Sequence, residues 1–328
     1  MKTYNIAVVG ATGMVGRKML QVLEERKLPI GNFYAFASKR SAGSKITFDG
    51  KEYTVIELTE ENVKAQPLDF ALFSAGGGTS KLFAPVFAAH GCVVVDNSSQ
   101  WRMDSSVPLV VPEVNRDALK THNNIIANPN CSTIQAVVAL KPLHDAFKIK
   151  RVVYSTYQAV SGAGVEGWKD LENGVKGEPP AKFARPIFGN VIPQIDVFLD
   201  NGYTKEEDKM IKETRKILGD SKMKITATTV RVPVYNGHSE SVNIEFAKKV
   251  TLEEVFAVLE KAPGVVLIKE QDKYPTPLEC DGKDEVFVGR VRIDQSLKSG
   301  IDCWIVADNI RKGAATNAVQ IVEAMINN

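Results

Sequence analysis

The sequence predicts an α/β protein of two domains, the first built on a mainly parallel sheet and the second on a mainly antiparallel one. Two observations support this prediction. Strand-like and helix-like segments alternate up to Cys131, as they do where helices cover both faces of a parallel sheet. Beyond Cys131, long runs of alternating apolar and polar residues dominate, which is typical of an antiparallel sheet with helices on one face.

The expected elements of the first domain follow in order. Strands are expected at residues 4–9, 33–37, 70–73 and 93–95, and helices at about 14–25 and 79–89. Residues 45–55, KITFDGKEYTV, predict a β-hairpin, because Asp49 and Gly50 can adopt the positive φ values of a tight turn.

The second domain begins with a helix expected at residues 132–147. Its strands are predicted by the runs RVVYSTYQAV, MKITATTVRVPV, SVNIEFAKK, EVFVGRVRI and GIDCWIVAD. Thr251 and Glu254 form a capping box at another helix start, whereas the Gly- and Pro-rich residues 162–186 are expected to be irregular. A final helix is expected at about 314–326. The predicted domains are 1–131, completed by about 312–328, and 132–311.

Composition excludes several classes of protein. With 328 residues, 44% of them apolar and 24% charged, the chain is long enough for two folded cores. The net charge of +2 predicts no nucleic-acid partner, and no apolar run approaches the roughly 18 residues of a membrane span. The N-terminus lacks the cleavage site of a secretory signal, and the four cysteines are far apart without a C-x-x-C pair. We therefore expect a cytoplasmic protein that binds neither a membrane nor a metal ion.

A glycine-rich turn joins the first expected strand to the first expected helix. Its sequence, GATGMVG at residues 10–16, is a variant of the Rossmann-type fingerprint, in which bare backbone N–H groups and a helix N-terminus face a pyrophosphate. Such turns also arise from close packing alone, but the strand before and the helix after favour a dinucleotide. The expected contacts are Gly10, Thr12, Gly13, Met14 and Val15.

The end of the second strand indicates which dinucleotide is bound. NAD enzymes usually carry a carboxylate there for the ribose 2′-hydroxyl, whereas this chain has Ser38, Lys39, Arg40 and Ser41. Two cations and two hydroxyls suit a 2′-phosphate, so NADP is the expected cofactor; the alternative is that both cations are solvated loop charges. A second glycine cluster at residues 74–78 is expected to let a ligand approach the same edge of the sheet.

Cys131 is the candidate nucleophile, because it lies at the first turn of an expected helix. A helix N-terminus favours the thiolate, which is the reactive form of cysteine; the alternative is a packed helix start. Cys92 and Cys303 lie in apolar strands and are expected to be buried. Cys280 lies in a charged loop, where neighbouring carboxylates would raise its pKa.

A thiolate beside a nicotinamide can perform a specific reaction. It adds to an aldehyde, the adduct loses a hydride, and the resulting thioester is cleaved by water or another nucleophile. The thiol proton needs a base. His238 is the best candidate because it is expected in a polar turn between two strands, whereas the other histidines lie near or within helices.

These motifs resemble those of the aspartate-β-semialdehyde dehydrogenase family. The resemblance spans essentially the whole chain and is carried by GATGMVG (10–16), SKRS (38–41), NSSQWRM (97–103), NPNCST (128–133), QAVSGAG (158–164), KETRKIL (212–218), RVPVYNGHSE (231–240) and DN (308–309). It implies a glyceraldehyde-3-phosphate dehydrogenase-like architecture and a homodimer. It also implies NADPH-dependent reductive dephosphorylation of L-4-aspartyl phosphate to aspartate semialdehyde, in the biosynthesis of lysine, diaminopimelate, methionine, threonine and isoleucine.

The resemblance implies a role for each matching residue. Cys131 resembles the nucleophile that forms the acyl-thioester, and His238 the acid/base. Gln158 would orient the substrate, Arg231 would clamp its α-carboxylate, and Glu213 would pair with its amino group.

The remaining matching residues concern phosphate and cofactor. Arg102 and Lys216 would bind the phosphate, and Ser161, Gly162 and Asn309 would lie at the cofactor. Two simpler interpretations stay open: an outward-facing arginine at position 231, and a surface ion pair between Glu213 and Lys216.

Two rival functions are weighed against this one. N-acetyl-glutamyl-phosphate reductase shares the architecture and the cysteine mechanism, but its acetylated substrate would leave Glu213 without a cationic partner. A non-catalytic NADP-binding sensor would keep the glycine turn and have no use for Cys131, Gln158 and His238 together.

Overall fold

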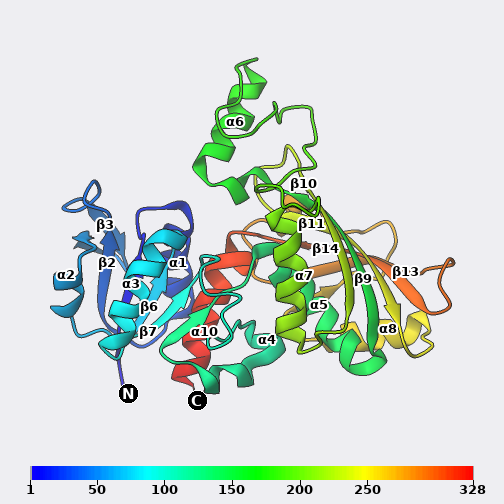
Figure 1. Ribbon diagram of the computed structural model, residues 1–328, viewed down its shortest axis with the longest axis horizontal. Helices are drawn as coiled ribbons and strands as arrows, with labels where there is room; N and C mark the ends of the chain where they lie inside the picture. Colours follow the sequence, from blue (N-terminus) through cyan, green and yellow to red (C-terminus); the bar gives the residue numbers. More distant parts are fainter. Residues whose placement is uncertain (1, 328) are drawn as a thin grey trace. The chain divides into compact units, whose positions relative to one another are not determined.

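The computed structural model describes residues 2–327, and the contacts within the chain divide it into two compact units (Figure 1). Unit 1 comprises Met1–Pro129 and Ala314–Asn328, and unit 2 comprises Asn130–Gly313. Among the described residues, none of the helices combines the length and the apolar character that crossing a membrane requires.

Unit 1 contains a parallel sheet, which the described residues form from six strands in the order β5-β2-β1-β6-β7-β8. The strands are β1 (Tyr4–Val9), β2 (Ile30–Ala37), β5 (Ile56–Glu57), β6 (Phe70–Phe73), β7 (Val93–Asp96) and β8 (Ile125–Ala127). The helices are α1 (Met14–Arg26), α2 (Glu60–Lys64), α3 (Gly77–Ala89), α4 (Pro112–Asn115), a 3₁₀-helix (Arg116–Thr121) and α10 (Thr316–Ile326). The parallel sheet predicted from the alternating pattern is confirmed.

Both faces of this sheet are covered, and this explains the continuous apolar runs of its strands. In β1, Ile6 and Val8 belong to the core packed by α1 and α10, and the residues between them point to the opposite face. On that opposite face, the Phe87 ring of α3 meets the rings of Phe36 and Phe73 edge-on, at 5.8 and 5.0 Å between ring centres.

The predicted hairpin is present as β3 (Lys45–Phe48) and β4 (Lys51–Thr54). Asp49 and Gly50 have φ values of 49° and 69°, as the turn requires.

Unit 2 contains a mixed sheet, with β10-β9-β11-β14-β13-β12 as its order among the described residues. The strands are β9 (Ile149–Gln158), β10 (Lys224–Arg231), β11 (His238–Phe246), β12 (Val265–Leu267), β13 (Val286–Ile293) and β14 (Gly300–Ala307). The helices are α5 (Cys131–Phe147), a 3₁₀-helix (Val160–Ala163), α6 (Val165–Val175), α7 (Lys205–Leu218), α8 (Leu252–Leu259) and α9 (Pro277–Cys280). A π-helical segment, Arg311–Ala315, leads into α10.

The central strands of this sheet are antiparallel, as predicted, while the two edge pairs, β10 with β9 and β12 with β13, are parallel. In Figure 1, α5 and α7 lie side by side against the sheet, and the two helices contact each other. Along β11, buried Glu240, Val242 and Ile244 alternate with partly exposed Ser241 and Asn243, so one face is covered and the other is more open.

The prediction that residues 162–186 are irregular is wrong for residues 165–175, which form α6, whereas residues 176–186 form neither helix nor strand. Its glycines permit the helix: Gly164 takes a φ of +76° at the N-cap, and a Cβ at Gly167 would lie 2.2 Å from the Val160 carbonyl oxygen. Asp170 of α6 then accepts hydrogen bonds from the N–H groups of residues 181–183 at 2.8 to 2.9 Å, which holds the irregular segment that follows.

The glycine turn of unit 1 generates a stability prediction. A Cβ at Gly16 would lie 2.2 Å from the Gly10 carbonyl oxygen, whereas a Cβ at Gly13 would lie 3.3 Å from the same atom and Gly13 has a φ of −77°. We expect Gly16→Ala to destabilise the protein by about 1–3 kcal/mol, the usual cost of overpacking, despite the better helix propensity of alanine. Gly13→Ala is the matched control and should change the apparent Tm little. Calorimetry measures both, and equal Tm values would contradict the steric argument.

Candidate active site

Cys131 is the first residue of α5, and its neighbour Asn130 caps that helix. The Asn130 Oδ1 atom accepts hydrogen bonds from the N–H groups of Ser132 and Thr133, at 3.0 and 3.2 Å. Cys131 is half-buried, and a Cβ at Gly313 would lie 2.9 Å from the Cys131 Cβ. The thiol is therefore held at a crowded helix start, where the backbone of residue 313 passes close by.

The other three cysteines are buried. Burial raises the pKa of Cys92 well above its ordinary value, and raises the pKa values of Cys280 and Cys303 to about 12. The prediction of a loop for Cys280 is wrong, since it is the last residue of α9, and burial raises its pKa more than the neighbouring acids do. These thiols are poor candidates for a nucleophile.

His238 is fully buried as the first residue of β11, so its expected place in a turn is wrong by one residue. Its Nδ1 atom accepts a hydrogen bond from the Ala159 N–H at 3.0 Å. Burial and the nearby Arg231 charge hold the pKa of His238 well below its usual value. The ring is therefore neutral near pH 7, and because Nδ1 accepts, the proton resides on Nε2.

Arg231 ends β10 directly beside Gln158, which ends the parallel strand β9. Its side chain is only 5% exposed, which excludes the outward-facing alternative. The Nη1 atom donates to the Ala159 carbonyl at 2.7 Å, and the guanidinium lies 5.8 Å from the Phe183 ring centre. Burial lowers the pKa of Arg231, while the charges of Glu206 and Cys131 oppose this effect.

Several predicted residues of unit 2 converge around Gly162. A Cβ there would lie 2.7 Å from the Arg231 Nη1 atom and 3.3 Å from the His238 Cε1 atom, so only glycine leaves this space free. Ser161 hydrogen-bonds to the Asn309 amide, with 3.0 Å between Oγ and Nδ2. The Asn309 Oδ1 atom also accepts from the Gly237 N–H at 2.9 Å, which ties down the turn before His238.

Glu213 lies on α7 and is 1% exposed. Its Oε2 atom accepts a hydrogen bond from the Asn130 N–H at 2.6 Å. A surface ion pair with Lys216 is therefore excluded as its sole role, and the carboxylate contacts the residue that precedes Cys131. Lys216 is partly buried on the same helix.

Sequence reasoning overlooked two residues of this site, Asn130 and Glu206. Asn130 could have been found, because Asn before an apolar helical run is an N-cap signal. Glu206 could not have been found, because its carboxylate contacts Asn130 and Gln158, which are 76 and 48 positions away in the sequence.

In unit 1, the predicted cofactor residues form a cradle of backbone groups. Gly10 has a φ of +81°, and a Cβ there would lie 2.4 Å from the Ser74 carbonyl oxygen, so the two glycine-rich loops touch. Gly13 caps α1 and Gly76 caps α3, and neither offers a side chain to the first-turn N–H groups. Two open helix N-termini at the carboxyl edge of a parallel sheet fit a pyrophosphate.

The other predicted ligand residues of unit 1 lie in loops after strands. Ser38 and Arg40 are exposed in the turn after β2, which the Ser41 N–H closes by donating to the Ser38 carbonyl at 2.8 Å. Arg102 is buried, and donates to the carbonyls of Asn128 and Asn97 at 2.9 Å each. Arg102 belongs to unit 1 and Lys216 to unit 2, so their joint binding of one phosphate stays a prediction.

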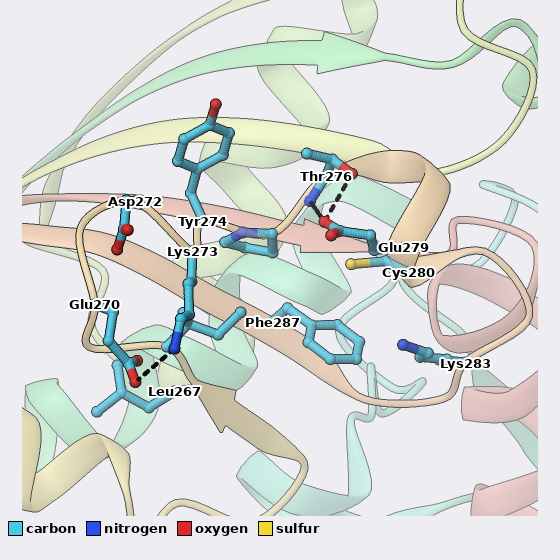
Figure 2. Close-up of a pocket in the computed structure, with 12 residues that line it drawn as sticks. Leu267, Glu270, Asp272, Lys273, Tyr274, Thr276, Glu279, Cys280, Lys283 and Phe287 are labelled. Carbon is cyan, nitrogen blue, oxygen red and sulfur yellow. Dashed lines mark hydrogen bonds and ion pairs between the residues drawn. The ribbon is translucent and has the colours of Figure 1, made fainter.

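A separate cavity of about 800 Å³ lies in unit 2 among residues 267–287 (Figure 2). Figure 2 shows Lys283 beside the Phe287 ring, with 5.2 Å from Nζ to the ring centre, and an ion pair between Glu270 and Lys273. The described residues that line it include none of the predicted site residues. This cavity is therefore distinct from the candidate active site.

Comparison with known proteins places this chain in a family. A family model for the semialdehyde dehydrogenase NAD binding domain matches residues 5–122, and one for the semialdehyde dehydrogenase dimerisation domain matches residues 140–312. Both models describe one class of protein, the semialdehyde dehydrogenases.

Individual relatives indicate which semialdehyde dehydrogenases this chain resembles. The aspartate-semialdehyde dehydrogenase of Aquifex aeolicus is 56% identical over 334 residues, with 98% of each chain covered. A crystal structure of aspartate semialdehyde dehydrogenase II from Vibrio cholerae, complexed with ASA, is 47% identical with a TM-score of 0.96, and covers 100% of this chain and 99% of its own. A Candida albicans enzyme with NADP is 26% identical with a TM-score of 0.79, and 99% of each chain is covered. The chain belongs to the aspartate-semialdehyde dehydrogenase family, which confirms the resemblance seen in the sequence.

The buried carboxyl of Glu240 generates a prediction about stability and pH. Glu240 follows His238 by two residues on the covered face of β11, and neither of its oxygens has a hydrogen-bond partner within residues 2–327. Burial raises its pKa well above the ordinary value, so the folded protein retains a proton that the unfolded chain releases. Each pH unit between the unfolded and the folded pKa then removes about 1.4 kcal/mol of stability.

Replacing Glu240 by Gln removes this titration, so the gain in stability over the parent should be larger at pH 7 to 8 than at pH 5. The measurement is Tm against pH for the parent, for Glu240→Gln and for Glu245→Gln, a control on the more open face of the same strand. If the Tm of the parent falls with rising pH no faster than the Tm of Glu240→Gln, then Glu240 is not the buried group that holds a proton in the folded protein.

Proposed function

We propose that this protein catalyses the NADPH-dependent reductive dephosphorylation of L-4-aspartyl phosphate to L-aspartate 4-semialdehyde, a reversible reaction through an acyl-thioester on Cys131. The observation that carries the proposal is a half-buried cysteine at the first position of α5, in the unit where buried Arg231 and His238 meet at Gly162. Membership of the family supports it, as does the name of the Aquifex aeolicus relative.

In the reductive direction, the Cys131 thiolate attacks the acyl carbon of the substrate, and the bond to the phosphate oxygen breaks. NADPH, when bound, supplies the hydride that reduces the thioester carbon. The resulting thiohemiacetal then collapses, and cleavage of its carbon–sulfur bond regenerates the thiolate and releases the semialdehyde.

We assign the acid/base role to His238 through its Nε2 atom. In the tautomer described above, Nε2–H donates a hydrogen bond and stabilises the oxyanion of the thiohemiacetal. In the oxidative direction, the ring accepts the proton of the thiohemiacetal hydroxyl only when Nε2 is deprotonated. That tautomer carries its proton on Nδ1 and must release the Ala159 N–H.

The other charged and polar residues recognise the substrate. Arg231 would bind the α-carboxylate, Glu213 the amino group, and Gln158 would orient the acyl oxygen. Arg102 and Lys216 would bind the phosphate, whether as leaving group or as inorganic phosphate.

The cofactor is expected at the glycine turn of unit 1, with NADP preferred. Gly10, Thr12, Gly13, Met14 and Val15 would hold the pyrophosphate through backbone groups, and Ser38, Arg40 and Ser41 the 2′-phosphate. Ser161, Gly162 and Asn309 would lie at the nicotinamide end. The Candida albicans neighbour, whose structure was determined with NADP, supports this cofactor.

We further propose that residues 1–131 with about 312–328 form the cofactor domain, and that 132–311 form the catalytic and dimerisation domain of a homodimer. The dimerisation-domain match supports the dimer. The reaction would serve the biosynthesis of lysine, diaminopimelate, methionine, threonine and isoleucine in the cytoplasm.

The direct test mixes enzyme, aspartate semialdehyde, inorganic phosphate and NADP, and follows NADPH absorbance. We expect phosphate-dependent turnover that Cys131→Ala abolishes and that His238→Ala lowers by roughly 10²- to 10⁴-fold. N-acetylglutamate semialdehyde is the control substrate and should turn over poorly. A rate that does not depend on phosphate would rule out the phosphorylating reaction.

The cofactor preference has its own test. Arg40→Ala should weaken NADP binding and leave NAD binding nearly unchanged, because only NADP carries the 2′-phosphate. KM is measured for both cofactors, with Lys51→Ala as a control that removes the same charge from the exposed hairpin. If the parent used NAD and NADP with equal efficiency, the interpretation of residues 38–41 would be wrong.

A further inference from the structure

We propose that Glu206 is a positioning residue whose buried carboxylate orients the side-chain amides of Asn130 and Gln158, so that Gln158 presents an N–H group to the thioester oxygen on Cys131. This inference rests on the proposed function and deepens it. Glu206 would touch neither substrate nor cofactor, and would act only through the two amides.

The carboxylate of Glu206 is the centre of a buried hydrogen-bond network. Its Oε1 atom accepts from the Asn130 Nδ2 atom at 2.8 Å and from the Gln158 Nε2 atom at 3.1 Å. Its Oε2 atom accepts from Lys209 at 3.1 Å, and Lys209 also reaches Asp196 at 2.8 Å. Within residues 2–327, Asn130, Gln158 and Lys209 thus each donate a hydrogen bond to this carboxylate.

The network keeps the carboxylate charged. Burial would favour the protonated form, but Lys209 and the amides of Asn130 and Gln158 outweigh this effect and lower the pKa of Glu206. An ionised carboxylate can only accept hydrogen bonds. Both amides must therefore turn their NH₂ groups toward Glu206.

This constraint decides which amide atoms remain for other partners. The Asn130 oxygen is turned to the first turn of α5, where it caps the helix that begins with Cys131. The Gln158 oxygen accepts from the Thr156 hydroxyl at 3.0 Å. Gln158 thus keeps its second N–H for a ligand.

An N–H donor is what the reaction needs at that position. Negative charge develops on the thioester oxygen during acyl transfer and reduction, and one oriented donor is typically worth about 10²- to 10³-fold in rate. A flipped amide would instead place its oxygen lone pairs against that charge. Fixing the amide in advance avoids this arrangement, and Glu206 is the group that fixes it.

The test compares the rate of Cys131 acylation in the parent and in Glu206→Gln. The glutamine side chain has the size of the carboxylate that it replaces. In one orientation its NH₂ group faces the NH₂ groups of Asn130 and Gln158, and in the other it faces the Lys209 ammonium, so a donor always meets a donor. Rapid mixing with semialdehyde and NADP, without phosphate, should produce a burst of NADPH. We expect the burst rate of Glu206→Gln to fall by about 10²-fold, with a smaller change in KM for the semialdehyde.

A matched control is available at the next position. Glu207 is also buried, and its carboxylate accepts from the N–H groups of Thr204 and Thr229 at 2.7 and 3.0 Å. Glu207→Gln should lower the Tm and leave the burst rate close to that of the parent. An equal loss of burst rate in both variants would mean that Glu206 only supports the fold, and would overturn the proposal.

A second variant, Lys209→Met, tests the same idea in two ways. Combined with Glu206→Gln, it removes the ammonium, so that the introduced amide can turn its oxygen to Asn130 and Gln158. The burst rate should then recover, and failure to recover would count against the proposal.

Alone, Lys209→Met keeps the Glu206 carboxylate but raises its pKa, with Asp196 and Arg231 as the remaining charges nearby. As the pH is lowered, the burst rate of Lys209→Met should begin to fall at a higher pH than that of the parent, because Glu206 gains a proton and becomes a donor. An unshifted pH profile would overturn the inference.

The outcomes separate this inference from the function on which it rests. A parent enzyme with neither burst nor phosphate-dependent turnover would refute the proposed function and this inference with it. A fully active parent together with an unaffected Glu206→Gln would refute the inference alone.

Discussion

The candidate active site depends on how α7 holds the start of α5. Two carboxylates of α7 bind the same residue: Glu213 accepts the backbone N–H of Asn130, and Glu206 accepts its side-chain amide. They are seven positions apart, which places them on one face of the helix. Since Asn130 caps the helix that begins with Cys131, these two hydrogen bonds set the position of the thiol relative to the sheet.

The sheet topology of unit 2 brings the remaining groups to this point. Because β9 and β10 are parallel, their carboxyl ends lie at one edge, and Gln158 and Arg231 are neighbours in register. The strand β11 is antiparallel to β9, so its first residue, His238, lies at the same edge. The Ala159 backbone then links them: its N–H contacts His238, and its carbonyl contacts Arg231. One short segment after β9 thereby orients both an imidazole and a guanidinium.

Burial gives these groups their chemical character. His238 is neutral because it is buried beside a cation, and its Nε2 atom carries the ring proton because Nδ1 accepts a hydrogen bond from the Ala159 N–H. Glu206 remains charged at a similar depth because donors surround it, whereas Glu240 has no such donors among the described residues and is neutral. Two carboxyl groups in one unit therefore differ in charge for a reason that can be read from their hydrogen bonds.

The sequence alone predicted both sheets, the hairpin at Asp49 and Gly50, the glycine turn, and Cys131 at the start of a helix. These features depend on residue periodicity and on hydrogen bonds between near neighbours, which local sequence encodes. The sequence analysis missed α6, because glycine can either interrupt a helix or allow one to pack closely. Within residues 165–175 the glycines allow the helix to pack closely. Only the tertiary structure decided that Glu206 and Glu213 are buried, and which amide and N–H groups they bind. Those contacts join residues 48 to 83 positions apart, so no local pattern of charge or polarity carries them.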